Sequence, residues 1–131
     1  MQNSYLGLLG LAKRAGKVES GDEAARSALT SKAARLVLIA GDASERTAET
    51  FRFIAESVNV PAVTVAETRA DIGNALGKRP CAVVAVCDMG FAAALVKKLA
   101  EGNEEAKSVL EETTRRAAKI QARKNKGKRK K

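Results

Sequence analysis

The sequence predicts an α/β domain in which helices cover both faces of a sheet. Three short runs of apolar and β-branched residues, at 35–40, 61–65 and 81–86, have the composition of strands that are largely buried. Segments with the apolar spacing of amphipathic helices lie before, between and after these runs. Helices that alternate with strands at this spacing are typical of a sheet with helices packed on both sides.

Local signals set the expected boundaries of each element. The first helix, over 4–15, ends at Gly16 and is followed by a short extended piece at 17–19. Its apolar stripe is expected to consist of Leu8, Leu11, Ala12 and Ala15. Later helices are expected at about 21–31, 45–57, 68–77, 89–101 and 104–122. The run 81–86 is the most apolar and is therefore expected at the centre of the sheet.

Polar residues at several expected helix starts are interpreted as caps. Thr68 and Asp71 have the spacing of a capping box. Either Ser44 or Asp42 can cap the helix that follows them, and Asp88 can cap the last helix of the core. Capping therefore accounts for these acidic residues without a catalytic role.

Positive charge is concentrated at the carboxyl end of the chain. The sequence has 24 basic and 15 acidic residues, a net charge of +9. Ten of the basic residues and no acidic residue lie in 113–131, so residues 1–112 carry 14 − 15 = −1. We expect a domain over 1–102 and a tail over 103–131 that is helical and then disordered. Such a tail binds RNA, DNA, an acidic protein or an anionic membrane, or serves solubility alone.

The composition excludes several classes of protein. The chain has no histidine, which excludes a Ser-His-Asp triad, a His-containing zinc site and a zinc finger of the C2H2 type. It has no Trp, three Phe and one Tyr, too few for a module that reads RNA by stacking on several aromatic rings. The usual phosphate-binding glycine motifs are absent. No apolar run is long enough to span a bilayer, so we expect a cytoplasmic protein. Because the usual ligand motifs are absent, we expect no cofactor and no metal.

The two cysteines are expected to be core residues. Cys81 and Cys87 lie six residues apart in an apolar run, which in a strand places both side chains on one face, too far apart for a disulfide. Their spacing is not that of a metal or redox motif.

The start of the second helix is the strongest candidate for a ligand site. Free backbone N–H groups and the positive end of the helix dipole favour a phosphate there, and Gly21 allows a close approach. Ser20 and Glu23 have capping-box spacing, so Glu23 has either a capping role or a binding role. Arg26 either reaches the same ligand or belongs to an exposed helix face.

Cations flank this helix start in the sequence. Lys13, Arg14 and Lys17 bracket the turn after the first helix, and Gly77-Lys78-Arg79-Pro80 forms a basic turn before the central strand. We expect Lys17, Lys78 and Arg79 to neutralise phosphates, with a solvated loop as the alternative for residues 77–80.

Four separated motifs resemble the L-seven-Ae / L-thirty-e ribosomal protein family, in particular its bacterial YlxQ-type members. They are YLGLLGLAKRAGKVESG at 5–21, RLVLIAGDAS at 35–44, RADIGNALGK at 69–78 and VVAVCDMGFA at 83–92. The resemblance covers about residues 4–100 in order and leaves out the tail. It implies a three-layer α-β-α sandwich with a small four-stranded mixed sheet that binds RNA and is not an enzyme.

The resemblance also implies a mode of recognition. Many members bind kink-turn RNA with a Gly-any-Asn-Glu motif at a helix start and a basic residue one turn later. Here Gly21 and Asp22 match the first two positions, whereas Glu23, Ala24 and Ser27 replace the asparagine, the glutamate and the basic residue. Each missing buried hydrogen-bond partner costs about 1–3 kcal/mol, which weakens specific kink-turn binding. The family's second RNA-contacting loop corresponds to residues 77–81.

We therefore expect a non-enzymatic, monomeric protein that binds structured RNA, either ribosomal RNA or a kink-turn-like element, and acts in translation or on the ribosome rather than at a membrane. The expected RNA-binding residues are Lys17, Gly21, Asp22, Glu23, Arg26, Ser27, Lys78 and Arg79. The tail adds phosphate contacts. The alternative is a protein-interaction adaptor of the ribosome or a translation factor in which only the tail touches RNA. An α/β enzyme that handles nucleotides is a further alternative.

Overall fold

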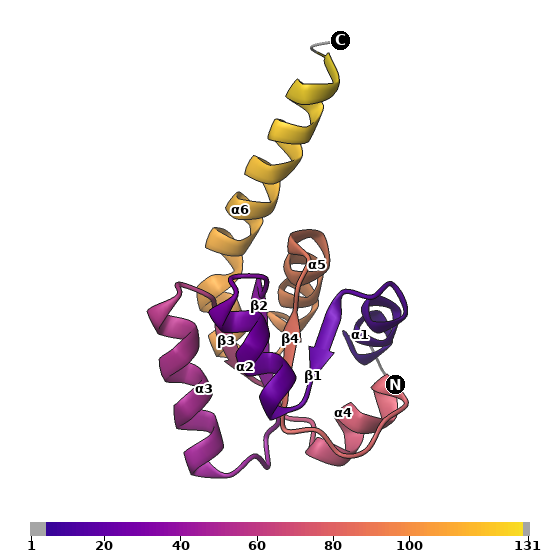
Figure 1. The fold of residues 1–131 in the computed structure, drawn as a ribbon, viewed down its shortest axis with the longest axis vertical. Coiled ribbons are helices and arrows are strands. Elements are labelled where there is room, and N and C mark those ends of the chain that lie inside the picture. Colours follow the sequence, from indigo (N-terminus) through magenta and orange to yellow (C-terminus); the bar gives the residue numbers. More distant parts are fainter. Residues whose placement is uncertain (1–4, 130–131) are drawn as a thin grey trace.

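Helices and strands alternate as predicted in the computed structural model, which describes residues 5–129 and the side chains of residues 5–124 (Figure 1). The helices are α1 (Tyr5–Arg14), α2 (Asp22–Thr30), α3 (Glu45–Ser57), α4 (Arg69–Leu76), α5 (Met89–Leu99) and α6 (Glu104–Arg129). The strands are β1 (Val18–Ser20), β2 (Leu36–Ile39), β3 (Ala62–Thr64) and β4 (Val83–Val86).

The four strands form one mixed sheet in the order β1-β4-β2-β3. β4 is antiparallel to both of its neighbours, while β2 and β3 are parallel. β4 and β2 occupy the two inner positions and every residue of both is buried, which confirms that the run 81–86 lies at the centre of the sheet. The predicted small mixed sheet is therefore confirmed.

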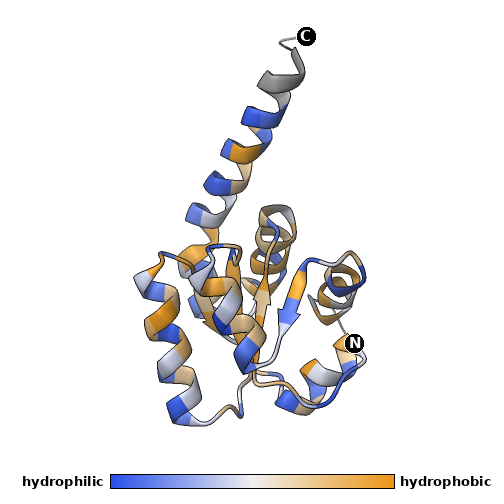
Figure 2. Ribbon diagram, in the orientation of Figure 1, coloured by the Kyte–Doolittle hydropathy of each residue, from blue (hydrophilic) through white to orange (hydrophobic). Residues whose placement is uncertain are grey.

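Alternate residues of the central strands pack into two apolar layers. Leu36, Leu38 and Val84 face the side covered by α1, α4, α5 and α6, whereas Val37 and Ile39 face α2 and α3. Figure 2 shows the central strands in the hydrophobic part of its scale, with hydrophilic segments on the outer helices. Each large side chain buried in these layers contributes about 1.5–3 kcal/mol. The predicted three-layer sandwich is confirmed.

The two cysteines do not share a face of the sheet, which corrects the sequence interpretation. Cys81 is buried in the layer beneath α1, α4 and α5, whereas Cys87 packs against the layer beneath α2 and α3. The reason is that β4 spans only Val83–Val86, so both cysteines lie outside the strand and its two-residue alternation does not connect them.

The predicted stripe on α1 is only partly correct, since Ala12 and Leu8 pack on the core but Leu11 and Ala15 are exposed. Leu9 and Ala12 are fully buried, while the side chain of Leu11 is 48% exposed. α4 lies across α1 at Gly10, where an added Cβ would be 3.0 Å from the carbonyl oxygen of Ala75. This crossing determines which side of α1 faces the core. Among residues 5–129, no helix combines the length and apolar character needed to cross a membrane.

The first part of α6 packs on the core. Ala106 and Thr113 are buried, and Val109, Leu110, Ala117 and Ile120 pack against the layer beneath α5. The domain boundary expected near residue 102 therefore lies between two packed helices. The helix continues to Arg129, so residues 123–129 are helical where we expected disorder, and residues 130–131 lie outside the described residues. Residues 121–129 contain no proline and are rich in good helix formers.

α6 also covers the outer edge of β3. The Thr64 N–H donates to Glu105 Oε1 at 2.8 Å, and Asn103 Nδ2 donates to the Thr64 carbonyl at 2.9 Å. Arg52 forms an ion pair with Glu105. Burial by itself raises the pKa of Glu105, but the hydrogen bonds from Arg52 and Thr64 outweigh it, and the pKa lies below its ordinary value. These contacts satisfy an exposed strand edge and attach the start of α6 to the sheet.

Candidate nucleic-acid interface

The start of α2 is built around Gly21. Gly21 is the N-cap residue, with φ 98° and ψ 160°, a backbone conformation that favours glycine. Its N–H donates to the Val83 carbonyl at 3.0 Å, which holds the turn against the central strand. The capping box expected from Ser20 and Glu23 is wrong. Ser20 is the last residue of β1, and no side chain caps α2.

The hydroxyl of Ser20 instead joins this turn to the basic loop. Lys78 Nζ donates to Ser20 Oγ at 3.2 Å. Ser20 and Gly21, together with residues 78–81, line an open hollow of about 380 Å³. The two loops that the sequence predicted as RNA-contacting therefore form one continuous surface, which we call the α2 site.

Close packing against α4 holds the basic loop in place. Gly77 ends α4 in the left-handed conformation, with φ 68°, and the Lys78 N–H donates to the Gly73 carbonyl at 2.8 Å. A Cβ on Gly73 would lie 2.4 Å from the carbonyl oxygen of Arg79. Sequence reasoning missed the role of Gly73. The sequence does contain a signal for this close packing, because Gly73 lies inside a short helix, four residues before a Gly-Lys-Arg turn.

The side chains of the first turns of α2 divide into two groups. Asp22, Glu23 and Ser27 are exposed and available to a ligand. The guanidinium carbon of Arg26 lies 5.3 Å from the ring centre of Phe51, a buried residue of α3. Arg26 thus makes a cation–π contact between α2 and α3 while its side chain remains at the surface.

Lys17 lies away from the α2 site. It precedes β1, whereas Gly21 follows it, so the two are separated by about 13 Å at 3.3 Å per residue. The Lys17 carbonyl accepts a hydrogen bond from the Cys87 N–H at the far end of β4. The structure therefore brings together Gly21, Lys78 and Arg79 but places Lys17 at the opposite end of the sheet.

The other helix starts are capped much as predicted. Thr68 and Asp71 form both hydrogen bonds of a capping box, and the Ser44 hydroxyl accepts from the Thr47 N–H. Asp88 accepts from the Phe91 N–H at 2.9 Å. Asp42 does not cap α3, because its carboxylate accepts the Arg69 N–H at 2.8 Å and so anchors the start of α4.

One of the two cysteines, Cys81, lines the α2 site. Burial raises the pKa of the Cys81 thiol, and the smaller opposing influences of the Gly21 and Val83 backbone and of Lys78 do not reverse it. The thiol is therefore kept in its unreactive protonated form. Within residues 5–129, no three His, Cys, Asp or Glu side chains gather into a group that could hold a metal ion.

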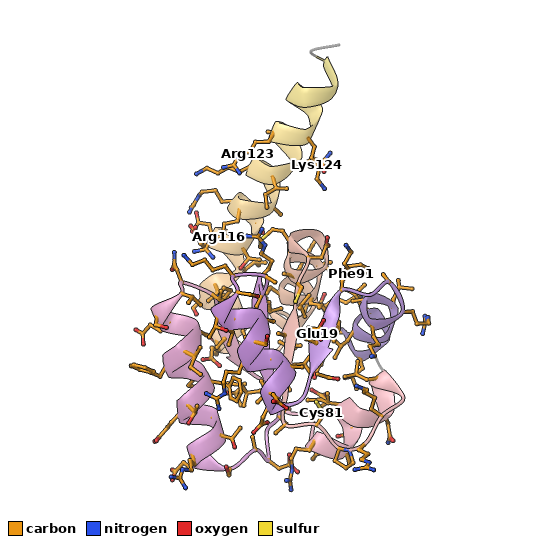
Figure 3. All side chains as sticks on the ribbon, in the orientation of Figure 1. Glu19, Cys81, Phe91, Arg116, Arg123 and Lys124 are labelled. Atoms are coloured by element: carbon orange, nitrogen blue, oxygen red, sulfur yellow. The ribbon has the colours of Figure 1, made fainter. Side chains whose placement is uncertain are left out.

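The charged part of α6 leaves the core at the opposite end from the α2 site. In Figure 1 the start of α2 and the loop before β4 lie at the bottom, and α6 projects from the top. Figure 3 labels Arg116, Arg123 and Lys124 along this projecting helix, and Cys81 near the start of α2. The molecule thus separates its cationic helix from the basic loop.

These features define a small α-β-α sandwich protein with a cationic helical extension. The profile of the ribosomal protein L7Ae/L30e/S12e/Gadd45 family matches residues 3–96. The chain belongs to this family. α6 lies outside the matched segment.

Curated relatives and solved structures agree with this assignment. The chain is 42% identical over 92 residues to the RNA-binding protein YlxQ of Bacillus subtilis, covering 70% of this chain and 91% of that protein. It is 35% identical over 97 residues to the YlxQ of Enterococcus faecium, covering 74% and 91%. A Bacillus halodurans protein of unknown function superimposes with a TM-score of 0.67 at 32% identity, covering 71% and 93%. The Giardia lamblia 15.5kD RNA binding protein shares the fold, with a TM-score of 0.63, 22% identity and coverage of 73% and 84%.

Proposed function

We propose that this protein binds structured RNA through the α2 site, without catalysing a reaction. The observation that carries the proposal is the contact between Lys78 and Ser20, which joins the start of α2 and the basic loop into one surface. The names of the YlxQ relatives, as RNA-binding proteins, support RNA as the ligand. The proposed target is ribosomal RNA or a kink-turn-like element in the cytoplasm, bound by one copy of the chain without a cofactor.

The groups at the α2 site suit the chemistry of a folded RNA. The backbone N–H groups of the first turn of α2, at the positive end of its dipole, favour a phosphate. Lys78 and Arg79 supply two further phosphate contacts. The exposed carboxylates of Asp22 and Glu23 accept hydrogen bonds from amino groups on base edges. Shape and backbone contacts carry most of this recognition, as is usual for RNA with double-stranded parts.

The cationic part of α6 is proposed to strengthen binding without adding sequence preference. Each phosphate that a Lys or Arg neutralises releases counterions, so affinity falls with salt by a slope of about 0.7–0.9 per contact. The same charge speeds the encounter with RNA.

A gain of function tests the α2 site more sharply than a loss. The variant Glu23→Asn/Ala24→Glu/Ser27→Lys places the family's motif residues on exposed or half-exposed positions of α2. We expect it to bind a kink-turn RNA at least tenfold more tightly than the unmodified protein, because each restored base contact contributes about 1–3 kcal/mol. Fluorescence anisotropy with a labelled kink-turn, beside a mutant RNA lacking the G·A pairs, measures the gain. An unchanged preference for the kink-turn would show that α2 does not face the RNA.

A loss of function separates this proposal from an adaptor role. Lys78→Gln/Arg79→Gln removes two charges from the α2 site, and Lys97→Gln/Lys98→Gln removes two from exposed positions at the end of α5. Structured RNA should bind about tenfold more weakly to the first variant and nearly normally to the second. Equal, normal binding by both variants would favour the adaptor, in which only the tail touches RNA.

A further inference from the structure

A second hollow lies at the end of the sheet opposite to the α2 site. Its volume is about 420 Å³, and we call it the distal hollow. It is lined by Lys32, Ala34, Arg35, residues 57–60, Met89 and Arg116. We infer that the distal hollow is a second RNA-binding site, which takes one unpaired nucleotide of a single strand. None of its residues belongs to the α2 site, so this inference goes beyond the proposed function.

Strand register places the two sites at opposite ends. One row of residues crosses the sheet at the end near the α2 site. The Gly21 N–H donates to the Val83 carbonyl, Val83 pairs with Ile39, and Ile39 pairs with Thr64. The backbone N–H of Arg35 donates a hydrogen bond to the Val86 carbonyl at the other end of β4. Arg35 lies four residues before Ile39, which is about 13 Å along β2.

α6 brings a third cation to the same end. Glu105 contacts Thr64, and Arg116 follows eleven residues later, about 16 Å further along the helix. The segment from Thr64 back to Asn59, which is β3 and the turn before it, also spans about 16 Å. Arg116 therefore reaches Asn59, and its Nη1 donates to the Asn59 carbonyl at 3.1 Å. The packing of α6 along β3 therefore places Arg116 at the edge of the distal hollow.

The lining of the distal hollow is cationic and contains no acidic residue. Lys32 and Arg35 form no ion pair with any carboxylate in the described part of the chain. Arg116 pairs with Glu112 at 2.9 Å, so its charge is partly neutralised. Two cations within one hollow that have no ion-pair partner among the described residues are an arrangement that favours a phosphate.

The inner surface of the hollow is apolar. Ala34 and Met89 are 3% and 6% exposed, and Val58 and Val60 are half-buried beside them. A methionine thioether makes favourable contacts with aromatic rings, and a nucleobase has the same flat π-surface. Ser57 and Asn59 add polar groups at the rim that suit a base edge or a ribose hydroxyl. Apolar walls with cations at the opening match a nucleotide better than a bare phosphate.

The concave shape selects a single strand over a duplex. A base can enter a hollow only when it is unstacked, which is the state of bases in single strands, loops and bulges. The strand can continue along α6, where Lys119 and Arg123 follow Arg116 at helical spacings of three and seven residues. Figure 3 shows Arg116 and Arg123 on one side of α6 and Lys124 on another. Lys17 lies at the same end of the sheet as Arg35. The backbones of these two residues are two strand spacings apart, which is about 10 Å.

Removing two charges from the hollow tests the inference on the full chain. Lys32→Asn/Arg35→Gln suits the fold, because Lys32 has φ 68° and asparagine tolerates that conformation. We expect this variant to bind a short oligouridine about tenfold more weakly, with a salt slope lower by about 1.4. Lys97→Gln/Lys98→Gln, with the same net charge, should change the affinity less than twofold. Equal affinities for the two variants would overturn the inference.

Two further measurements identify the ligand as a nucleotide of RNA. The unmodified protein should bind oligouridine more tightly than an abasic strand of equal length, and the double variant should lose most of that difference. A thiouridine-substituted strand should crosslink to the segment 57–60 or to Met89. Equal binding of the abasic strand, or full competition by polyglutamate, would show a general polyanion surface and overturn the nucleotide site. Kink-turn binding should be unchanged in Lys32→Asn/Arg35→Gln, which separates this result from any failure of the α2 site.

Discussion

The two ends of the sheet present different surfaces to a ligand. At the α2 site, the Lys78 ammonium bonds to the Ser20 hydroxyl, Asp22 and Glu23 are exposed, and backbone geometry at Gly21 and Gly77 shapes the surface. At the distal hollow, two cations from the connection between α2 and β2 and one from α6 surround an apolar floor. The first surface depends on exact backbone positions, and the second depends on charge and on the docking of one helix.

With the α2 site as the proposed RNA surface and the distal hollow as the inferred second site, one small chain would combine two kinds of RNA contact. A balanced, rigid surface distinguishes shapes, because a misplaced partner leaves groups unpaired. A cationic hollow tolerates many sequences, because phosphates and flat bases are common to all RNA. The family match ends at residue 96, so the cationic end includes an element from outside the matched segment. The predictions below change each end separately.

The largest effect is expected from Gly73→Ala, which disrupts the α2 end. The new Cβ would lie 2.4 Å from the carbonyl oxygen of Arg79, so the basic loop must move away from α4. We expect a loss of about 2–3 kcal/mol in the free energy of unfolding, measured with urea. Among the described residues, no atom lies within 4 Å of a Cβ added at Gly7, so the control Gly7→Ala should stabilise α1 by about 0.5–1 kcal/mol. Equal effects of the two variants would contradict the packing described for the basic loop.

A smaller effect is expected from Glu105→Gln, which weakens the attachment of α6 and so the distal end. The loss of charged hydrogen bonds to Arg52 and Thr64 should lower the free energy of unfolding by about 1–2 kcal/mol. The pKa of Glu105 is lower in the folded protein than its ordinary value of 4.5. Its stabilisation is therefore fully present above about pH 4.5 and is lost as the pH falls through the folded-state pKa.

Denaturation curves at several pH values measure this dependence. The difference in stability between the unmodified protein and Glu105→Gln should narrow as the pH falls below 4.5. Glu104→Gln provides a control, because the Glu104 side chain is 90% exposed and pairs only with Lys107 within its own helix. A difference that does not change with pH would show that Glu105 does not anchor α6 through its charge.

The smallest effect is expected from Lys32→Gly, in which stability and binding change in opposite directions. Lys32 occupies the left-handed conformation, which costs a residue other than glycine about 1–2 kcal/mol. After the entropy cost of glycine, the variant should be more stable by about 0.5–1 kcal/mol, although it binds oligouridine more weakly. Lys97→Gly, inside α5, should instead lose about 1 kcal/mol. Thermal unfolding distinguishes the two, and a destabilised Lys32→Gly would be inconsistent with the backbone described at this turn.

Local patterns were sufficient to predict most of the architecture. The apolar runs at 35–40 and 81–86 were predicted as strands, with 81–86 at the centre of the sheet. The caps at Thr68 and Asp88 were predicted correctly, and Ser44 is the one of two candidates that caps α3, because each cap depends on residues three positions apart. The capping box at Ser20 was wrong, because Gly21, held by its N–H bond to the Val83 carbonyl, is the N-cap of α2, and Lys78 donates to the Ser20 hydroxyl. The stripe predicted on α1 was wrong at Leu11 and Ala15, because α4 crosses that helix at Gly10.

The sequence by itself determined the order of elements, the buried centre of the sheet and the excess of charge after residue 113, since these follow from neighbouring residues and composition. Only the tertiary structure decided which distant side chains meet. It places the Lys78 ammonium against the Ser20 hydroxyl and Lys17 at the end of the sheet opposite to the α2 site. It also places Lys32, Arg35 and Arg116 around the distal hollow. The physical reason is that strand register and helix packing, which act between residues far apart in the chain, set these positions.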